Sequence, residues 1–175
     1  MMPAPELVVL ADGTTMEKSS VHTADTPLHH GFSCWIVREN QVLLTRRSLQ
    51  KLTWPGVWTN AFCGHPGPGE SAADAVRRRG QFELGIADLN PELVLPDFRY
   101  RAVDTSGFVE NELCPVFVAY YDGELLPRPD EVDTFEWVEI SSLITAVDST
   151  PFAFSPWLVD ELAQIDLREY LMKLT

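Results

Sequence analysis

The sequence is poor in basic residues. Its 175 residues include 13 lysines and arginines against 26 aspartates and glutamates, which gives a formal net charge of −13. Binding to nucleic acid or to an acidic lipid surface requires a basic face, so we expect neither partner. The chain also lacks any apolar run of about 18 residues, and its opening stretch MMPAPELVVLADG has no basic segment. We therefore expect no membrane-spanning segment and no signal peptide.

Cysteine is also scarce. The three cysteines are Cys34, Cys63 and Cys114, and neither their odd number nor their spacing fits a disulfide framework or a zinc finger. Such cysteines are typical of free thiols in a reducing compartment, so we expect a cytoplasmic protein.

The length of the chain and its 45% hydrophobic residues fit one domain over residues 1–175. Apolar patterns and turn signals predict strands at residues 6–10, 32–37, 41–46, 57–63, 98–103, 108–120 and 133–139. Helices are predicted from Ser71 to Gly85 and over residues 140–147 and 157–172. Ser71 or Glu70 is expected to cap the start of the first helix, and Gly85 is expected to end it. This order of elements predicts an α/β (α+β) sandwich around a mixed sheet, and nothing in it demands more than a monomer.

The few histidines are concentrated in two turn-rich segments. His22, His29 and His30 lie in HTADTPLHH, and His65 lies in CGHPGPG. Each histidine alone is more often a hydrogen-bonded or surface residue. Their grouping nevertheless suggests metal ligands.

Two glutamates, Glu110 and Glu112, lie two residues apart on a predicted strand, so they share a face. An isolated pair of this kind is usually a solvated strand face. Here the neighbours Val109 and Leu113 are apolar, and two like charges in such surroundings repel each other unless a cation lies between them. Three imidazoles and two carboxylates suit a divalent ion such as Mn²⁺, Mg²⁺ or Zn²⁺.

Cys63 ends an apolar strand directly before the glycine-rich loop GHPGPGE. Most cysteines in such a place are inert packing residues, and we interpret Cys34 and Cys114 in that way. Beside the possible ligand His65, Cys63 is a better candidate for acid–base or nucleophilic chemistry. The loop amides, at the start of the next helix, could bind phosphate, although the segment could also be an ordinary amphipathic helix with a Gly/Pro-rich entry.

The loop and helix resemble the Nudix box, G-x5-E-x7-R-E-U-x-E-E-x-G-U, where U is apolar. The residues on register are Gly64, Glu70, Arg78, Glu83, Gly85 and Ile86. Arg79 and Phe82 stand where the hydrolases carry glutamates, and Gly80 replaces the apolar residue. Hydrolysis at phosphorus needs several carboxylates to hold metal ions, so this helix suits diphosphate binding better than hydrolysis.

Most of the chain resembles one branch of that superfamily, the type 1 isopentenyl-diphosphate delta-isomerases. The matching stretches are EKSSVHTADTPLHHGFS, LLTRRSLQKLTWPGVWTNAFCGHP, PDFRYRA, GFVENELCPVF and FAFSPW. The resemblance implies a Nudix-like α/β/α sandwich and interconversion of isopentenyl and dimethylallyl diphosphate in isoprenoid biosynthesis. It also implies two cofactors, Mg²⁺ and one further divalent ion (Mn²⁺, Mg²⁺ or Zn²⁺).

By this resemblance, the further divalent ion would be bound by His22, His29, His65, Glu110 and Glu112. Cys63 and Glu112 would transfer protons, with Tyr100 forming a hydrogen bond near Glu112. Glu83 and the carbonyl of Cys63 would hold the Mg²⁺ that arrives with the substrate. The substrate itself would contact Lys18, Arg47, Lys51, Arg79 and Trp157.

The chemistry explains why such residues are needed. The double bond of the substrate is unactivated, so protonation to a tertiary carbocation must precede loss of a proton from the neighbouring carbon. An acid and a base must therefore face the substrate from two sides, in a site that excludes water. Two alternatives stay open at this point: a Nudix pyrophosphohydrolase acting on nucleotide diphosphates, and a non-catalytic module that binds a metal or ligand.

Overall fold

A mixed seven-stranded sheet forms the centre of the structure, a computed structural model that describes residues 4–175. Its main strands, in spatial order, are β12 (Val132–Glu139), β5 (Gln41–Arg47), β4 (Phe32–Arg38), β11 (Val116–Tyr120) and β8 (Glu92–Leu95). Two short strands extend it, β6 (Trp58–Thr59) beside β5 and β7 (Phe62–Gly64) beside β4. The β4–β11 pair is parallel, and the other pairs of this sheet are antiparallel.

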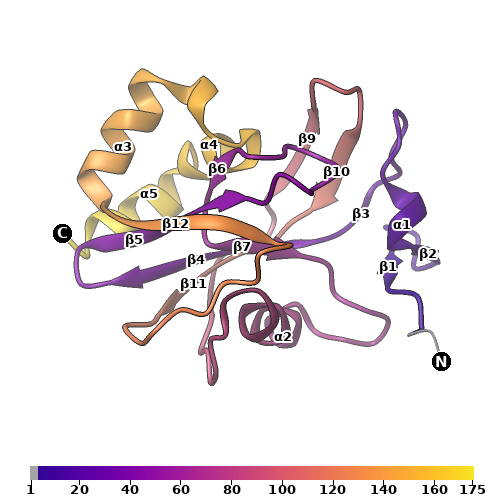
Figure 1. Ribbon diagram of the computed structural model, residues 1–175, viewed down its shortest axis with the longest axis horizontal. Coiled ribbons are helices and arrows are strands. Elements are labelled where there is room, and N and C mark those ends of the chain that lie inside the picture. The colour runs from indigo at the N-terminus through magenta and orange to yellow at the C-terminus, as the bar shows by residue number, and fades with distance from the viewer. Residues whose placement is uncertain (1–3) are drawn as a thin grey trace.

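Helices cover both faces of this sheet (Figure 1). Helix α2 (Ala72–Leu84) lies on one face, and the opposite face carries α3 (Ile140–Ser149), α4 (Pro156–Leu162) and α5 (Ile165–Met172). The short 3-10 helix η1 (Pro151–Ala153) connects α3 to α4. This arrangement confirms the predicted α/β/α sandwich. Within residues 4–175, no helix is both long enough and apolar enough to cross a membrane.

The two cores follow from the alternation of side chains along β4. Phe32, Cys34 and Ile36 belong to the core on the α2 side. Trp35 and Val37 belong to the core under α3, α4 and α5. Because neighbouring residues of a strand point to opposite faces, Ser33 shares the face of Trp35. Cys34 and Cys114 are buried core residues, as predicted.

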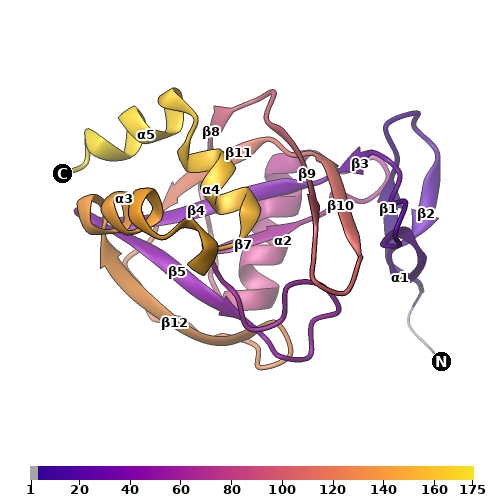
Figure 2. The ribbon, with the colours of Figure 1, turned by 90° about the horizontal axis from the view of Figure 1, so that it is seen from above.

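A second sheet lies next to the N-terminal segment (Figure 2). It has the strand order β3 (His29–His30), β10 (Val109–Leu113) and β9 (Arg99–Val103). The N-terminal segment consists of the hairpin β1 (Leu7–Val9) and β2 (Thr15–Glu17) with the short helix α1 (Lys18–Val21). An isolated bridge between Leu10 and His29 joins the two parts.

Three predicted elements are divided in the structure. The strand expected over residues 108–120 is split at Cys114–Pro115, because β10 pairs with β3 in one sheet and β11 pairs with β4 in the other. The strand expected over 57–63 crosses from β5 to β4 at Asn60–Ala61. The helix expected over 157–172 begins at Pro156 and is interrupted at Gln164, whose backbone is extended (φ −73°, ψ 124°).

The predicted ends of the first long helix are confirmed. The Ser71 hydroxyl accepts a hydrogen bond from the amide of Asp74 at 3.1 Å, and Gly85 ends the helix in the left-handed conformation (φ 70°). The prediction missed β2, α1, β3 and β8, and it expected one sheet where residues 4–175 form three. The single domain over 1–175 stays a prediction, and its first three residues lie outside the described part of the chain.

Candidate active site

A cavity of about 520 Å³ lies where the N-terminal segment, the second sheet and the ends of β5 and β7 meet. It is lined by every site residue predicted from the sequence except His29: Lys18, His22, Arg47, Lys51, Cys63, His65, Arg79, Glu83, Tyr100, Glu110, Glu112 and Trp157. These residues come from widely separated parts of the chain, so the fold brings them together.

Three histidines and two glutamates gather on one wall of the cavity. One donor atom from each of His22, His29, His65, Glu110 and Glu112 lies within 4.8 Å of all the others. The β-pairing explains part of this arrangement, because Glu112 lies opposite His29 in the parallel β10–β3 pair. Glu110, two residues earlier, shares the face of Glu112. The neighbouring His30 is not in this group.

The donor atoms of this group are in a state that suits a divalent cation. The Nδ1 atom of His29 lies 2.9 Å from the Pro27 carbonyl and donates to it, so the Nε2 atom is left as an acceptor. Nε2 is buried and has no hydrogen-bond partner among the described residues. One carboxylate oxygen of Glu112, Oε1, lies 3.0 Å from the Nε2 atom of His65 and 3.4 Å from that of His29. Three nitrogen donors and two carboxylates fit Mn²⁺, Mg²⁺ or Zn²⁺ without selecting among them.

Gly31 makes room for this group. A Cβ atom at this position would clash with the carboxylate of Glu112. Gly31 belongs to none of the predicted site residues, although its place directly after His29 and His30 indicates a close approach of the backbone.

The Cys63 side chain lies on β7, opposite Ser33 of β4. Its sulfur lies 3.5 Å from the Ser33 hydroxyl and 3.8 Å from the Asn60 side-chain oxygen. Burial, and then the nearby Glu161 carboxylate, raise the pKa of Cys63 well above its ordinary value. The group at this wall is therefore a neutral thiol that can donate a proton.

Aromatic side chains complete the cavity next to Cys63. The Trp157 ring, from α4, is 3% exposed and packs edge-on against Trp54 at 5.3 Å. The Tyr100 ring lies 6.0 Å from Trp157, and in the β9–β10 pair its residue lies opposite Glu112. Within residues 4–175 the Tyr100 hydroxyl forms no hydrogen bond to Glu112, so here Tyr100 acts as an aromatic wall.

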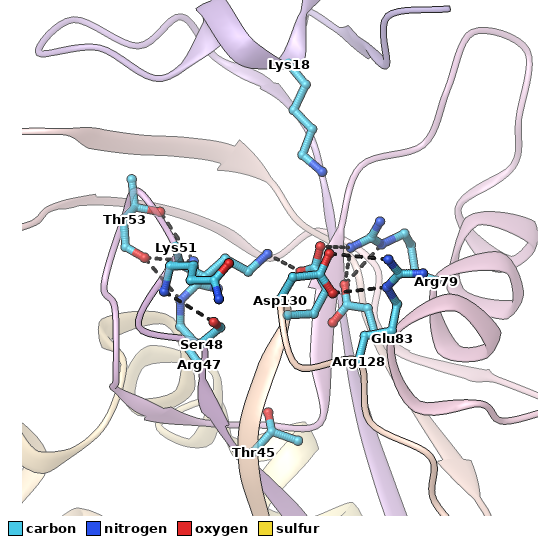
Figure 3. A network of polar contacts seen from close by, with 12 residues as sticks. Lys18, Thr45, Arg47, Ser48, Lys51, Thr53, Arg79, Glu83, Arg128 and Asp130 are labelled. Carbon is cyan, nitrogen blue, oxygen red and sulfur yellow. Dashed lines mark hydrogen bonds and ion pairs between the residues drawn. The ribbon is translucent and has the colours of Figure 1, made fainter. Parts of the chain in front are cut away.

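Cationic side chains occupy the other end of the cavity. Figure 3 shows Lys18, Lys51 and Arg79 pointing toward a common centre from three different elements. The fourth predicted cation, Arg47, is held by a hydrogen bond of 2.8 Å to the Thr53 carbonyl. Four cations thus gather at this end of the cavity in a chain whose net charge is −13.

Three carboxylates pair with these cations, and one of them is Glu6, which lies 3.0 Å from Lys18. Glu83 pairs with Arg79 four residues earlier on α2, with 3.0 Å between the Arg79 Nε and Glu83 Oε1 atoms. Glu131 forms an ion pair with Lys51 and lies 3.4 Å from Arg79. Glu131 is not among the residues predicted from the sequence, since a glutamate in the acidic stretch PDEVD carries no local signal.

The Nudix-box residues outside this network stabilise the loop. Arg78 donates to both carboxylate oxygens of Glu70, at 2.8 and 2.7 Å, and to the carbonyl of His65 at 3.1 Å. Phe82, at a position where hydrolases carry a glutamate, lies under the guanidinium groups of Arg79 (4.7 Å) and Arg128 (4.2 Å). At positions 79 and 82, where hydrolases carry glutamates, α2 therefore offers a cation and an aromatic ring in place of metal ligands.

Comparison with known proteins agrees with these features. The NUDIX domain family matches residues 27–158. A protein named isopentenyl-diphosphate Delta-isomerase from Paenarthrobacter aurescens is 55% identical over 170 residues, which cover 94% of this chain and 92% of that protein. A protein of the same name from Corynebacterium diphtheriae is 56% identical over 177 residues, which cover 95% of this chain and 96% of that protein. The chain belongs to the isopentenyl-diphosphate Delta-isomerase family.

Solved structures show how this isomerase family shares its fold with other proteins. The crystal structure of DR0079 from Deinococcus radiodurans has a TM-score of 0.62 at 15% identity and covers 97% of this chain and 98% of that one. The MutT protein from Methanosarcina mazei has a TM-score of 0.61 at 18% identity and covers 85% of this chain and 93% of that one. Identities this low show the Nudix fold alone, so the isomerase assignment depends on the sequence relatives and the site.

Proposed function

We propose that this chain interconverts isopentenyl diphosphate and dimethylallyl diphosphate in isoprenoid biosynthesis, by protonation and deprotonation through a tertiary carbocation. The observation that carries the proposal is that Cys63 and Glu112 line one cavity whose other end is cationic. A flat five-carbon chain with a diphosphate group has one apolar end and one anionic end, and the cavity has matching ends.

In this proposal, Cys63 and Glu112 exchange protons with the substrate from two sides. One group protonates an end of the allylic system, and the other removes a proton from the opposite end. The two roles are exchanged in the reverse direction, so the reaction is reversible. Tyr100 and Trp157 exclude water that would otherwise trap the carbocation. The indole face of Trp157 stabilises that charge by about 2 kcal/mol.

Two divalent ions complete the proposed site. The first, Mn²⁺, Mg²⁺ or Zn²⁺, is held by His22, His29, His65, Glu110 and Glu112, and it supplies charge that keeps the Glu112 carboxylate in place. The second is Mg²⁺, held by Glu83 and the carbonyl of Cys63, and it neutralises the diphosphate. Lys18, Arg47, Lys51 and Arg79 would bind the same group directly.

The small-molecule substrate is the partner we assign, and the proposal requires no nucleic acid, no membrane and no second copy of the chain. We place the enzyme in the cytoplasm, because Cys34, Cys63 and Cys114 are all free thiols.

The proposal and the hydrolase alternative differ in their products. We would incubate the protein with Mg²⁺ and isopentenyl diphosphate and follow the dimethylallyl product by NMR, in parallel with phosphate release from a panel of nucleotides. The proposal expects the dimethylallyl product and no released phosphate. Phosphate release without isomerisation would support the pyrophosphohydrolase. The absence of both activities would support a non-catalytic binding module.

A further inference from the structure

A chain of hydrogen bonds connects Cys63 to a fully buried carboxyl group, Glu161. The Cys63 sulfur lies 3.5 Å from the Ser33 hydroxyl, which lies 3.0 Å from the Glu161 Oε2 atom. Both Ser33 and Glu161 are 0% exposed. Glu161 comes from α4 and contacts the face of β4 that also carries Trp35. It belongs neither to the metal-ligating group nor to the cationic end of the cavity.

The direction of these hydrogen bonds follows from the chemistry of each group. A serine hydroxyl has one proton to donate and two lone pairs that accept. The Asn60 amide nitrogen can only donate, and it lies 2.8 Å from the Ser33 hydroxyl. The proton of Ser33 therefore goes to Glu161 Oε2, which also accepts from the Trp35 indole nitrogen at 2.7 Å. The lone pair that remains on Ser33 faces Cys63.

The position of Glu161 is costly for the fold. Its Oε1 atom is buried without a hydrogen-bond partner among the described residues. Burial raises the pKa of Glu161 to about 8, although Trp35 and Ser33 donate hydrogen bonds to it. An apolar side chain would fill the same space at lower cost. An expensive carboxyl group directly behind the reactive thiol therefore points to a role in that thiol's geometry.

We propose that Glu161 is a positioning residue that holds the Cys63 sulfur at one place on the cavity wall by fixing the orientation of the Ser33 hydroxyl. This inference rests on the proposed function, which requires Cys63 to reach one carbon of the substrate. The bond from the thiol to Ser33 is weak, so the thiol proton leaves it at little cost when substrate is bound.

Three variants separate this role from simple packing. Glu161→Leu removes the acceptor of the Ser33 proton and leaves the Ser33 hydroxyl free to turn. Ser33→Ala removes the connecting oxygen, and the Asn60 amide nitrogen that donates to it keeps its bond to the Cys34 carbonyl at 2.8 Å. Glu161→Gln keeps an oxygen acceptor at the same place. The control is Asp160→Asn, which changes an exposed carboxylate one residue away.

The test measures kcat and KM for isopentenyl diphosphate, together with Tm, for the full-length, metal-loaded protein. We expect Glu161→Leu and Ser33→Ala to lower kcat about ten- to a hundredfold with KM changed less than about twofold, because binding is intact and only the reacting group is misplaced. Glu161→Gln is expected to recover most of the kcat that Glu161→Leu loses. The kcat of the double variant Ser33→Ala/Glu161→Leu should be no lower than that of the slower single variant. Tm should fall in Glu161→Leu, because the buried Trp35 indole nitrogen loses its acceptor, whereas Ser33→Ala leaves that hydrogen bond in place.

The possible results decide the inference. A Glu161→Leu enzyme with wild-type kcat, a Glu161→Gln enzyme as slow as Glu161→Leu, or a Ser33→Ala enzyme whose loss of kcat parallels a loss of Tm would overturn it. Ser33→Ala, which deletes a single oxygen, decides the question if Glu161→Leu does not fold. A wild-type protein without isomerase activity would overturn the proposed function and this inference with it, whereas an active wild type with unaffected variants overturns the inference alone.

Discussion

Cys63 and Glu112 line the same cavity although they belong to different sheets. Cys63 lies on β7 of the seven-stranded sheet, and Glu112 lies on β10 of the three-stranded sheet. Proton transfer on two sides of one small substrate requires two groups that reach the same space from different elements. Side chains in separate cavities could not perform this reaction, so the shared cavity meets its first geometric requirement.

The two proton-transfer residues should be individually essential. We expect Cys63→Ser and Glu112→Gln each to leave less than about a tenth of wild-type isomerisation, because each variant keeps the size of the side chain and removes its proton chemistry. The rate of dimethylallyl diphosphate formation measures the effect, and circular-dichroism melting verifies that the fold is intact. A folded variant that retains more than this rate contradicts its assigned role.

The metal site can be tested with two adjacent histidines. His29→Ala should lose the bound ion and have a lower Tm than the wild type. His30→Ala should keep the ion and the wild-type Tm, because of these two histidines only His29 lies in the ligating group. A ligand present at a hundred times its Kd stabilises the folded state by about 2.7 kcal/mol, so chelation should lower the wild-type Tm as well. Metal analysis after gel filtration counts bound ions. An unchanged metal content in His29→Ala would be incompatible with the site.

Glu83 should set the Mg²⁺ requirement of the reaction. We expect Glu83→Gln to raise the Mg²⁺ concentration for half-maximal rate by about tenfold, since a carboxylate ligand is replaced by an amide. Glu70→Gln is the matched control, because Glu70 lies in the same Nudix box but pairs with Arg78. A Mg²⁺ titration of the rate measures both variants. Equal Mg²⁺ dependence in Glu83→Gln and the wild type would remove Glu83 from the proposed ion site.

Glu161 should make stability depend on pH. Its pKa of about 8 in the folded protein exceeds the ordinary value of 4.5, so between these values the folded state holds a proton that the unfolded state has lost. The free energy of unfolding should therefore fall as pH rises through this range, by up to about 1.4 kcal/mol per unit. The charged groups that raise this pKa are Glu112 and Asp160.

Glu161→Gln removes this titration and isolates its effect. The variant should be more stable than the wild type at pH 8, and the difference should shrink toward pH 5. Urea unfolding at several pH values measures the free energy of unfolding of both proteins. Contributions from other titrating groups cancel when the two values are subtracted. A difference that does not change with pH would mean that Glu161 is ionised throughout.

Local signals predicted much of this molecule, and long-range pairing explains what they missed. Ser71 and Gly85 mark their helix ends through contacts within one turn, so the sequence alone located them. The division of residues 108–120 between two sheets depends on pairing with residues 29–37, about eighty positions earlier, which no local pattern reveals. Pro115, which lacks an amide hydrogen, was the available sign of that break.

The same distinction applies to the site. The ligating histidines and glutamates, Cys63 and Trp157 lie in distinctive stretches of sequence, so the resemblance to a known family located them. Glu131 and Glu161 lie in segments without such a pattern. Their significance comes from what they contact in the folded protein: Lys51 and Arg79 for Glu131, and Ser33 and Trp35 for Glu161.

The central claim, that a proton is added from one protein group while another is removed, is tested most directly by the reaction in D₂O. Protein groups such as a thiol and a carboxyl exchange their protons with solvent, so NMR of the dimethylallyl diphosphate formed by the wild-type enzyme should show deuterium in the newly formed methyl group. A product that forms at the same rate but carries no deuterium would indicate direct hydrogen transfer within the substrate. That result would contradict the roles proposed for Cys63 and Glu112.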